Sequence, residues 1–424
     1  MFEKLRKEIE EYALGFENKK AAETFVKCFF NTIDTTCKFQ EDGSVFVLTG
    51  DIPAMWLRDS SAQVMQYLYF AKDAEVQALL KGVLKRQFQM ICIDPYANAF
   101  KCKEGDWGEW DGRVETDFLP KIVWERKFEV DSLCYPLFLL FAYYEKTNDR
   151  SVFDELFLQA FDKIFETLEK ERKHSERSTY FFRWKESERK GNVYGNDSQT
   201  EKGLVWSAFR PSDDKCRYHY HIPDNMFVVS VLTKMSKVFK MLRDELRMEK
   251  CLRLAKELSA LIEIYGVVEL DGKKVYVSET DCLGNYHIDD DANIPSLLSL
   301  PYLQYPYLDK EIYNNTRTVV LSKANKYYYE GKYLKGIGSP HTPPNRVWPL
   351  AVAMQGITSE DTAEIRRCFE MLVNSTNETG YMHEGIDVND VSVYSRPWFA
   401  WANSLFAYFV LTKEKVLLNN NKQQ

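Results

Sequence analysis

Two short segments near the C-terminus bring a carboxylate, an imidazole, an arginine and two tryptophans close together in the chain. The first reads Gly380-Tyr-Met-His-Glu384, and the second reads Ser395-Arg-Pro-Trp-Phe-Ala-Trp-Ala-Asn403. Tryptophan faces cover the C–H patches of a pyranose ring, while carboxylate, imidazole and guanidinium groups bind its hydroxyls. This combination favours sugar recognition, and the contact residues that we expect from it are His383, Glu384, Arg396 and Trp398.

Carboxyl groups that could cleave a glycosidic bond are also present. Such hydrolysis needs one carboxyl to protonate the leaving oxygen and another to activate water or attack carbon. The doublet Asp213-Asp214 follows Arg210-Pro211, and adjacent carboxylates can raise each other's proton affinity, as a general acid requires. Glu384 has no acidic neighbour and suits a base. The doublet is equally ordinary capping chemistry, so both interpretations stay open at this point.

Further polar segments could hold the sugar. Arg58 and Asp59 follow Trp56, so the arginine could donate to one hydroxyl and the aspartate accept from the next, with the tryptophan as floor. A buried ion pair under a core tryptophan is the alternative. His341, its neighbour Asn345, and Arg210 are further candidate contacts for the sugar.

The triplet Asp289-Asp290-Asp291 is the one motif that suggests a divalent metal or the acid cluster of an α/α cyclase. No partner cluster at helical spacing accompanies it. We therefore expect neither a metal nor another cofactor.

The elements that must position these residues are helices. Apolar residues recur at steps of three and four from Phe153 to Leu168 and from Met226 to Leu242, and similar stripes begin at many other points along the chain. Strand signal is limited to short pieces such as Phe46–Leu48 and Lys274–Ser278. A dozen or so helices without a sequence repeat favour a closed α/α toroid over a superhelical array. The polar segments fall between helices, so one rim of the toroid could gather them.

Composition limits the remaining possibilities. The 424 residues contain no linker, which predicts one domain over residues 1–424 with a disordered polar tail at 416–424. A net charge of −7 without basic runs argues against a nucleic-acid partner, and neither a signal peptide nor a membrane span is recognisable. Nine scattered cysteines indicate reduced thiols. We expect a cytoplasmic protein that is a monomer or a weak homodimer.

Several longer motifs resemble glycoside hydrolase family 125, the exo-acting α-1,6-mannosidases. They extend in the family's order from about residue 45 to 405. The matching segments are Gly50-Asp-Ile-Pro-Ala-Met-Trp-Leu-Arg-Asp-Ser60, Trp124-Glu-Arg-Lys-Phe-Glu-Val-Asp-Ser-Leu-Cys-Tyr-Pro136, Trp206-Ser-Ala-Phe-Arg-Pro-Ser-Asp-Asp214, Asn293-Ile-Pro-Ser-Leu-Leu298, Trp348-Pro349 and Arg396-Pro-Trp-Phe-Ala-Trp-Ala-Asn403.

The resemblance implies an (α/α)6 barrel that releases mannose from the non-reducing end of α-mannosides, by metal-independent single displacement with inversion. It assigns the general acid to Asp213, with Asp214 as the fallback, and the base to Glu384. The residues that it places around the terminal mannose are Arg58, Asp59, Asp131, His341 and Arg396. One departure is Gly385-Ile386, where the family commonly has Ser-Phe after the base. A second is the segment Asp106-Trp-Gly-Glu-Trp-Asp111, a variation on a polar family loop.

Three other functions remain open on the sequence alone. An inverting α-glycosidase or phosphorylase of similar fold could act on another sugar. A catalytically silent mannoside-binding protein would keep the tryptophans and Arg58-Asp59 but would not need Asp213 or Glu384. A metal-dependent cyclase would require the Asp289–Asp291 cluster and would be inhibited by a chelator.

Overall fold

Helices account for about half of the computed structural model, which describes residues 1–186, 192–193 and 201–418. Two of the helical elements are short 3-10 helices, η1 (Met65–Phe70) and η2 (Arg150–Val152). The α-helices are α1 (Glu3–Ala13), α2 (Lys19–Thr35), α3 (Leu57–Ala62), α4 (Ala74–Ile93), α5 (Val130–Thr147), α6 (Glu155–Glu171), α7 (His174–Arg177), α8 (Ile222–Leu242), α9 (Glu245–Tyr265), α10 (Leu300–Leu303), α11 (Lys310–Val320), α12 (Pro349–Thr358), α13 (Thr362–Asn374), α14 (Ala400–Thr412) and α15 (Glu414–Leu417).

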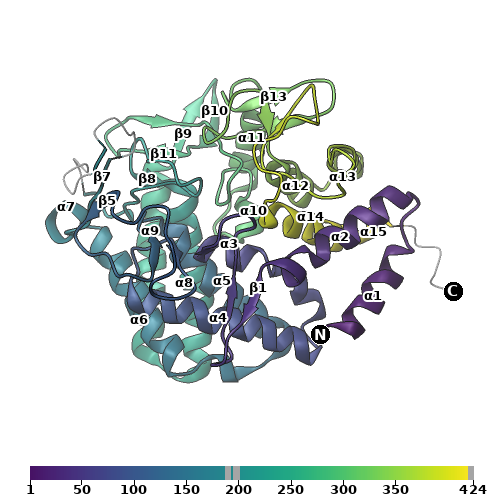
Figure 1. Ribbon diagram of the computed structural model, residues 1–424. Helices are drawn as coiled ribbons and strands as arrows, with labels where there is room; N and C mark the ends of the chain where they lie inside the picture. Colours follow the sequence, from purple (N-terminus) through teal and green to yellow (C-terminus); the bar gives the residue numbers. More distant parts are fainter. Residues whose placement is uncertain (187–191, 194–200, 419–424) are drawn as a thin grey trace.

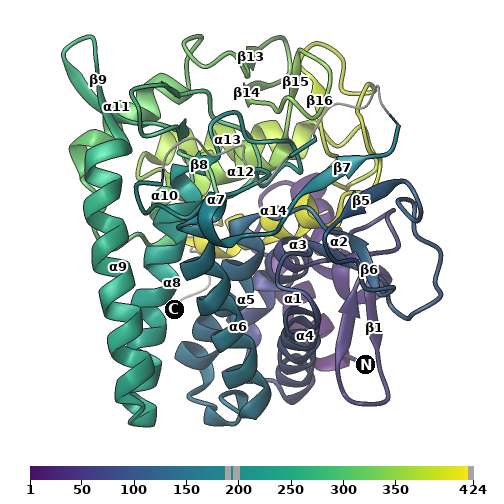
Figure 2. The same cartoon turned by 90° about the vertical axis from the view of Figure 1, so that its left-hand side faces the viewer.

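Six of these helices form a closed inner ring. In chain order α3, α5, α8, α10, α12 and α14 each contact the next, and α14 returns to α3. Outer helices pack behind them, with α2 against α14, α9 against α8, and α13 against α12. Figures 1 and 2 show α4, α5, α6, α8 and α9 side by side on one flank of the molecule. The predicted (α/α)6 barrel is therefore confirmed.

The two rings differ in sequence because they differ in burial. Inner helix α14 is buried almost all round, so its apolar residues show no single face. Outer helix α6 is amphipathic, and its buried residues include Phe157, Phe161 and Phe165. The stripes predicted at 153–168 and 226–242 correspond to α6 and α8.

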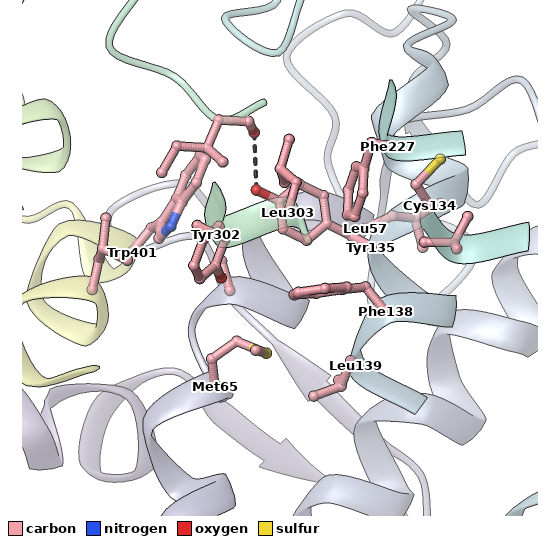
Figure 3. Packing of buried hydrophobic residues seen from close by; sticks show 14 of the residues in the cluster. Leu57, Met65, Cys134, Tyr135, Phe138, Leu139, Phe227, Tyr302, Leu303 and Trp401 are labelled. Atoms are coloured by element: carbon pink, nitrogen blue, oxygen red, sulfur yellow. Dashed lines mark hydrogen bonds between the residues drawn. The ribbon is translucent and has the colours of Figure 1, made fainter. Parts of the chain in front are cut away.

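Large apolar side chains fill the barrel below its rim. Figure 3 shows Leu57 of α3, Tyr135 and Phe138 of α5, Phe227 of α8 and Trp401 of α14 meeting in one cluster. The Tyr135 hydroxyl donates to the carbonyl of Ile294 at 2.9 Å, so the polar atom of this buried ring is satisfied. The barrel is thus a packed core and is closed at this level.

Short strands in the long loops complete the fold, and most of them gather at one end of the barrel (Figures 1 and 2). All of their pairings are antiparallel. The predicted strand pieces correspond to β2 and β10. The strands are β1 (Cys37–Phe39), β2 (Val45–Val47), β3 (Met55–Trp56), β4 (Ala99–Phe100), β5 (Val114–Thr116), β6 (Val123–Glu125), β7 (Phe182–Trp184), β8 (Tyr220–His221), β9 (Val267–Leu270), β10 (Lys273–Tyr276), β11 (Glu279–Thr280), β12 (Tyr286–His287), β13 (Tyr328–Glu330), β14 (Lys335–Ile337), β15 (Arg346–Val347) and β16 (Ile386–Asp387).

The C-terminal tail begins later than the sequence suggested. Val416 and Leu417 belong to α15 and pack against the main core, and residues 419–424 lie outside the described residues. All nine cysteines lie within the described part of the chain, and none is paired. No described helix is both long and apolar enough to cross a bilayer.

Candidate active site

A pocket at the loop-rich end of the barrel collects most of the predicted residues. Its cavity volume is about 70 Å³. Its wall comes from segments far apart in the chain, which the closed ring of helices brings together. The lining residues are Thr49, Ile52, Trp56, Arg58, Asp59, Pro211, Ser212, Asp213, Asn293, His341, Trp348, Glu384, Arg396, Phe399 and Trp401.

Arg58 is the centre of the charge network in this pocket. Its Nη1 donates to Glu129 Oε2 at 2.7 Å and to Asp131 Oδ2 at 3.1 Å, and its Nη2 donates to Asp213 Oδ1 at 2.9 Å. Its Nε lies 3.4 Å from Asp59 Oδ2. Four carboxyl groups surround one buried guanidinium, which cannot neutralise all of them. Burial raises the pKa of Asp59 to about 6 and that of Asp131 to about 7, despite the attraction of Arg58.

Asp213 occupies a tight turn with an uncommon backbone conformation. Its φ is 62°, a left-handed value that is rare outside glycine and that often marks functional sites. The turn is held by hydrogen bonds from Asp213 N to Arg210 O at 2.9 Å and from Arg210 N to Asp214 O at 2.8 Å. Burial favours a raised pKa for Asp213, but Arg58 and Lys127 outweigh it and hold the pKa below its usual range.

Asp214 points away from its neighbour. Its Oδ2 accepts from Ser212 Oγ at 3.1 Å and lies 3.6 Å from His341 Nδ1. Although burial opposes the ionised form, His341 lowers the pKa of Asp214. The expectation that the doublet raises its own proton affinity is therefore wrong, because each carboxyl faces a different cation.

Glu384 stands at another part of the wall with its own partners. Ser395 Oγ donates to Glu384 Oε2 at 2.7 Å, and Arg396 Nη1 donates to Oε1 at 3.3 Å. Arg396 is anchored in turn by Asp51 and by the carbonyl of Thr49, the latter at 3.0 Å. Both oxygens of Glu384 are thus fixed in a side chain that is only 5% exposed.

Comparison with known proteins identifies the family. The family model described as metal-independent α-mannosidase (GH125) matches residues 18–411. The chain belongs to glycoside hydrolase family 125. This family 125 chain is also 37% identical to the Meiotically up-regulated gene 157 protein of Schizosaccharomyces pombe, over 95% of its own length and 84% of that protein.

Solved structures agree with this assignment. A Streptococcus pneumoniae member of a family of metal-independent α-mannosidases, in a non-productive complex with α-1,6-mannobiose, is 41% identical with a TM-score of 0.91. The match covers 96% of each chain. Glucoamylase from Saccharomycopsis fibuligera, at 12% identity and a TM-score of 0.56, covers 98% of this family 125 chain and 96% of its own. That match shows the shared fold alone.

Several predicted contact residues of this family 125 chain lie behind the pocket wall. Asp131 is fully buried beneath Arg58, and Arg210 Nε lies 3.6 Å from Glu279 Oε1. His383 is behind the base, where its Nδ1 is 2.9 Å from the Pro397 carbonyl and burial lowers its pKa. These three side chains support the wall, whereas the sequence suggested direct contact.

Trp398 and Asn345 also lie outside the wall. Trp398 and Trp401 are three residues apart but do not share a helix face, because the chain is extended at Phe399 and α14 begins at Ala400. Trp398 Nε1 therefore donates to Asn31 of α2 at 3.2 Å, while Trp401 lines the pocket. Asn345 is exposed, in a left-handed conformation with φ of 63°.

Other functional residues were missed from the sequence. Trp348 and Trp401 form an aromatic wall with Phe399, whose ring centroid lies 5.8 Å and 6.1 Å from theirs. Asn293 also lines the pocket, and Glu129 binds Arg58 from below. All five lie inside the family-like motifs, which is the signal that could have found them.

The two departures from the family pattern differ in their surroundings: Gly385-Ile386 is enclosed, whereas the 106–111 segment includes an exposed tryptophan. Ile386 is buried in the main core within β16, away from solvent. A Cβ on Gly385 would approach Trp348 Nε1 to 3.0 Å and Thr342 Oγ1 to 3.2 Å, so this position is crowded. Trp107 of the 106–111 segment is 70% exposed and meets Trp124 edge-on at 5.6 Å.

The aspartate triplet has structural partners. Asp290 accepts from the backbone N–H groups of Leu297 and Leu298 at 2.7 and 3.0 Å, and Asp289 pairs with Lys326 at 2.7 Å. Within residues 1–186, 192–193 and 201–418, no three His, Cys, Asp or Glu side chains are grouped closely enough to hold a metal ion. The triplet therefore organises its own loop.

Proposed function

We propose that this family 125 enzyme is an exo-acting α-1,6-mannosidase that inverts the anomeric centre. The observation that best supports this proposal is a pocket whose floor is the barrel core. In this pocket Asp213 and Glu384 are held by separate sets of partners. A closed pocket admits only the end of a glycan chain. The linkage is supported by the α-1,6-mannobiose bound to the S. pneumoniae relative, and the substrate class by that relative's connection to N-linked glycans.

In this proposal Asp213 protonates the leaving oxygen and Glu384 removes a proton from the attacking water. Such a single displacement needs room for water, and the carboxyl groups of inverting glycosidases are about 6.5–9.5 Å apart. Arg396 and Ser395 keep Glu384 oriented. Asp59, which has an ion pair with Arg58, faces the pocket and would accept a hydrogen bond from a sugar hydroxyl. The side chains of Trp56, Trp348 and Trp401 would cover the apolar face of the mannose.

We also propose that the enzyme is a monomer or a weak homodimer, since one chain already brings Asp213, Glu384 and Arg58 into one pocket. Nine unpaired thiols support a reducing, cytoplasmic location.

Mannose release from α-1,6-, α-1,2- and α-1,3-linked mannobiose tests the proposal. We expect the α-1,6 isomer to be hydrolysed fastest, and Glu384→Gln to abolish turnover while leaving mannoside binding, measured by calorimetry, largely intact. Undiminished turnover in that variant would remove Glu384 from the mechanism. Turnover that requires inorganic phosphate and yields mannose 1-phosphate would identify a phosphorylase instead.

A further inference from the structure

The proposed acid, Asp213, shares the guanidinium of Arg58 with a second carboxyl group, that of Glu129. Glu129, the N-cap residue of α5, binds Arg58 Nη1, and Asp213 binds the adjacent Nη2. The Glu129 side chain is fully buried, and its Oε1 accepts no hydrogen bond from the described residues. Asp213 is on a different segment, and its carboxyl remains 21% exposed toward the pocket.

The two carboxyl groups bind the two terminal nitrogens of the same guanidinium, at 2.7 and 2.9 Å, so they lie close together. Arg58 carries one positive charge and also contacts Asp59 and Asp131, so we expect one member of the Glu129–Asp213 pair to be protonated. The pair therefore holds one proton, and the question is which member keeps it in the resting enzyme.

The surroundings of Asp213 favour its ionised form. The cations that face it are Arg58, Lys127 and His341, and the acids near it, besides Glu129, are Asp59 and Glu125. Asn98 Nδ2 adds a long hydrogen bond of 3.4 Å to Oδ1. Three cations and a pocket-facing position let Asp213 carry charge more easily than a fully enclosed carboxyl can.

The surroundings of Glu129 favour its neutral form. Among the described residues, Arg58 is the one cation within ion-pair distance of Glu129, and Arg58 also contacts Asp59, Asp131 and Asp213. The other titratable groups that face it are Asp131, Lys127, Tyr180, Cys216 and Asp213. Burial raises the pKa of Glu129 well above its usual value. If Asp213 is the ionised member of the pair, a neighbouring group can supply the proton that the general acid must deliver.

We propose that Glu129 is a positioning residue that stores the proton which Asp213 delivers to the leaving oxygen. This inference rests on the proposed function, in which Asp213 is the acid. As the glycosidic oxygen approaches, the Glu129 O–H bond breaks and an O–H bond forms on Asp213. That bond breaks in turn as the leaving oxygen takes the proton and the anomeric C–O bond opens. Water adds to the anomeric carbon and gives its proton to Glu384. Solvent then reprotonates Glu129 and deprotonates Glu384, so the enzyme returns to its starting state with no net gain or loss of protons.

The test compares two substrates in the full-length enzyme. α-1,6-Mannobiose needs a protonated leaving group, whereas α-mannosyl fluoride depends on protonation far less. We expect Glu129→Gln, which keeps the shape but stores no transferable proton, to lower kcat on mannobiose by about 100-fold or more. Its kcat on the fluoride should fall by less than about tenfold, and the alkaline limb of the mannobiose pH profile should move to lower pH, because Asp213 alone beside Arg58 loses its proton more readily.

Two controls keep the result interpretable. Asp131→Asn alters another carboxyl on the same Arg58 nitrogen and should affect both substrates by similar factors. Asp213→Asn should reproduce the selective loss on mannobiose. Equal losses on both substrates in Glu129→Gln, or none, with the selective loss retained in Asp213→Asn, would overturn the inference about Glu129 alone. If Asp213→Asn also lacks the selective loss, the assignment of Asp213 as the acid fails.

Discussion

Ser395 connects the side chain of Glu384 to the backbone beside it. The Ser395 hydroxyl donates to Glu384 Oε2 at 2.7 Å and accepts from the N–H of Gly385 at 3.0 Å. A hydroxyl thus reaches the proposed base although the chain has glycine, not serine, directly after it. The contact fixes one carboxylate oxygen, which leaves less freedom for the base to turn away from the attacking water.

Ser395→Ala should therefore lower kcat more than it weakens binding. A hydrogen bond to a charged group contributes about 1.5–3 kcal/mol, so we expect a loss of roughly tenfold or more in kcat on α-1,6-mannobiose. Ser392→Ala is the matched control, because the hydroxyl of this exposed serine of the same loop donates to Asp390 and, within the part of the chain that the structure describes, to no other group. Equal rates for both variants would show that the Ser395 contact does not orient the base.

Arg58→Lys should destabilise the protein as well as inactivate it. A lysine ammonium cannot bridge the carboxyl groups that two guanidinium nitrogens now bind, so buried acids would lose their partner. Breaking a buried pair of this kind costs about 3–5 kcal/mol. Urea unfolding measures the loss, with Arg253→Lys, in an exposed pair, as the control at about 1 kcal/mol or less. A stability equal to wild type would mean that the cluster does not depend on the fork geometry.

The pair of His341 and Asp214 predicts a specific pH dependence. Burial alone would lower the pKa of His341, but Asp214 raises it to about 9. Since the folded pKa is above the ordinary value of about 6.5, the pair's contribution to stability is complete below pH 6.5 and disappears as pH rises through 9. NMR titration of the His341 ring should show this pKa, and Asp214→Asn should lower it toward 6.5. A ring that titrates near 6.5 in the wild-type protein would exclude the pairing.

The sequence predicted the fold well because the spacing of apolar residues along a helix reflects which face of that helix is buried. Stripes at steps of three and four marked α6 and α8, and the position of polar segments between helices indicated that one rim would gather them. The helix boundary near Trp398 was less predictable, since only the extended backbone at Phe399 separates the roles of Trp398 and Trp401.

The charge states in the site were not predictable from local sequence. The neighbour of Asp213 in the chain is Asp214, but its electrostatic partner is Arg58, 155 positions earlier. The same separation hid Glu129, which reads as an ordinary helix-start acid until the barrel brings it to the other nitrogen of that guanidinium.

The stereochemistry of the first product tests the central claim most directly. Proton NMR of an α-1,6-mannobiose digest, followed through the opening minutes before mutarotation, reports the anomer released. If Asp213 protonates the leaving oxygen while Glu384 activates water in a single displacement, β-mannose must appear first. Early α-mannose would mean retention through a covalent intermediate and would contradict this mechanism.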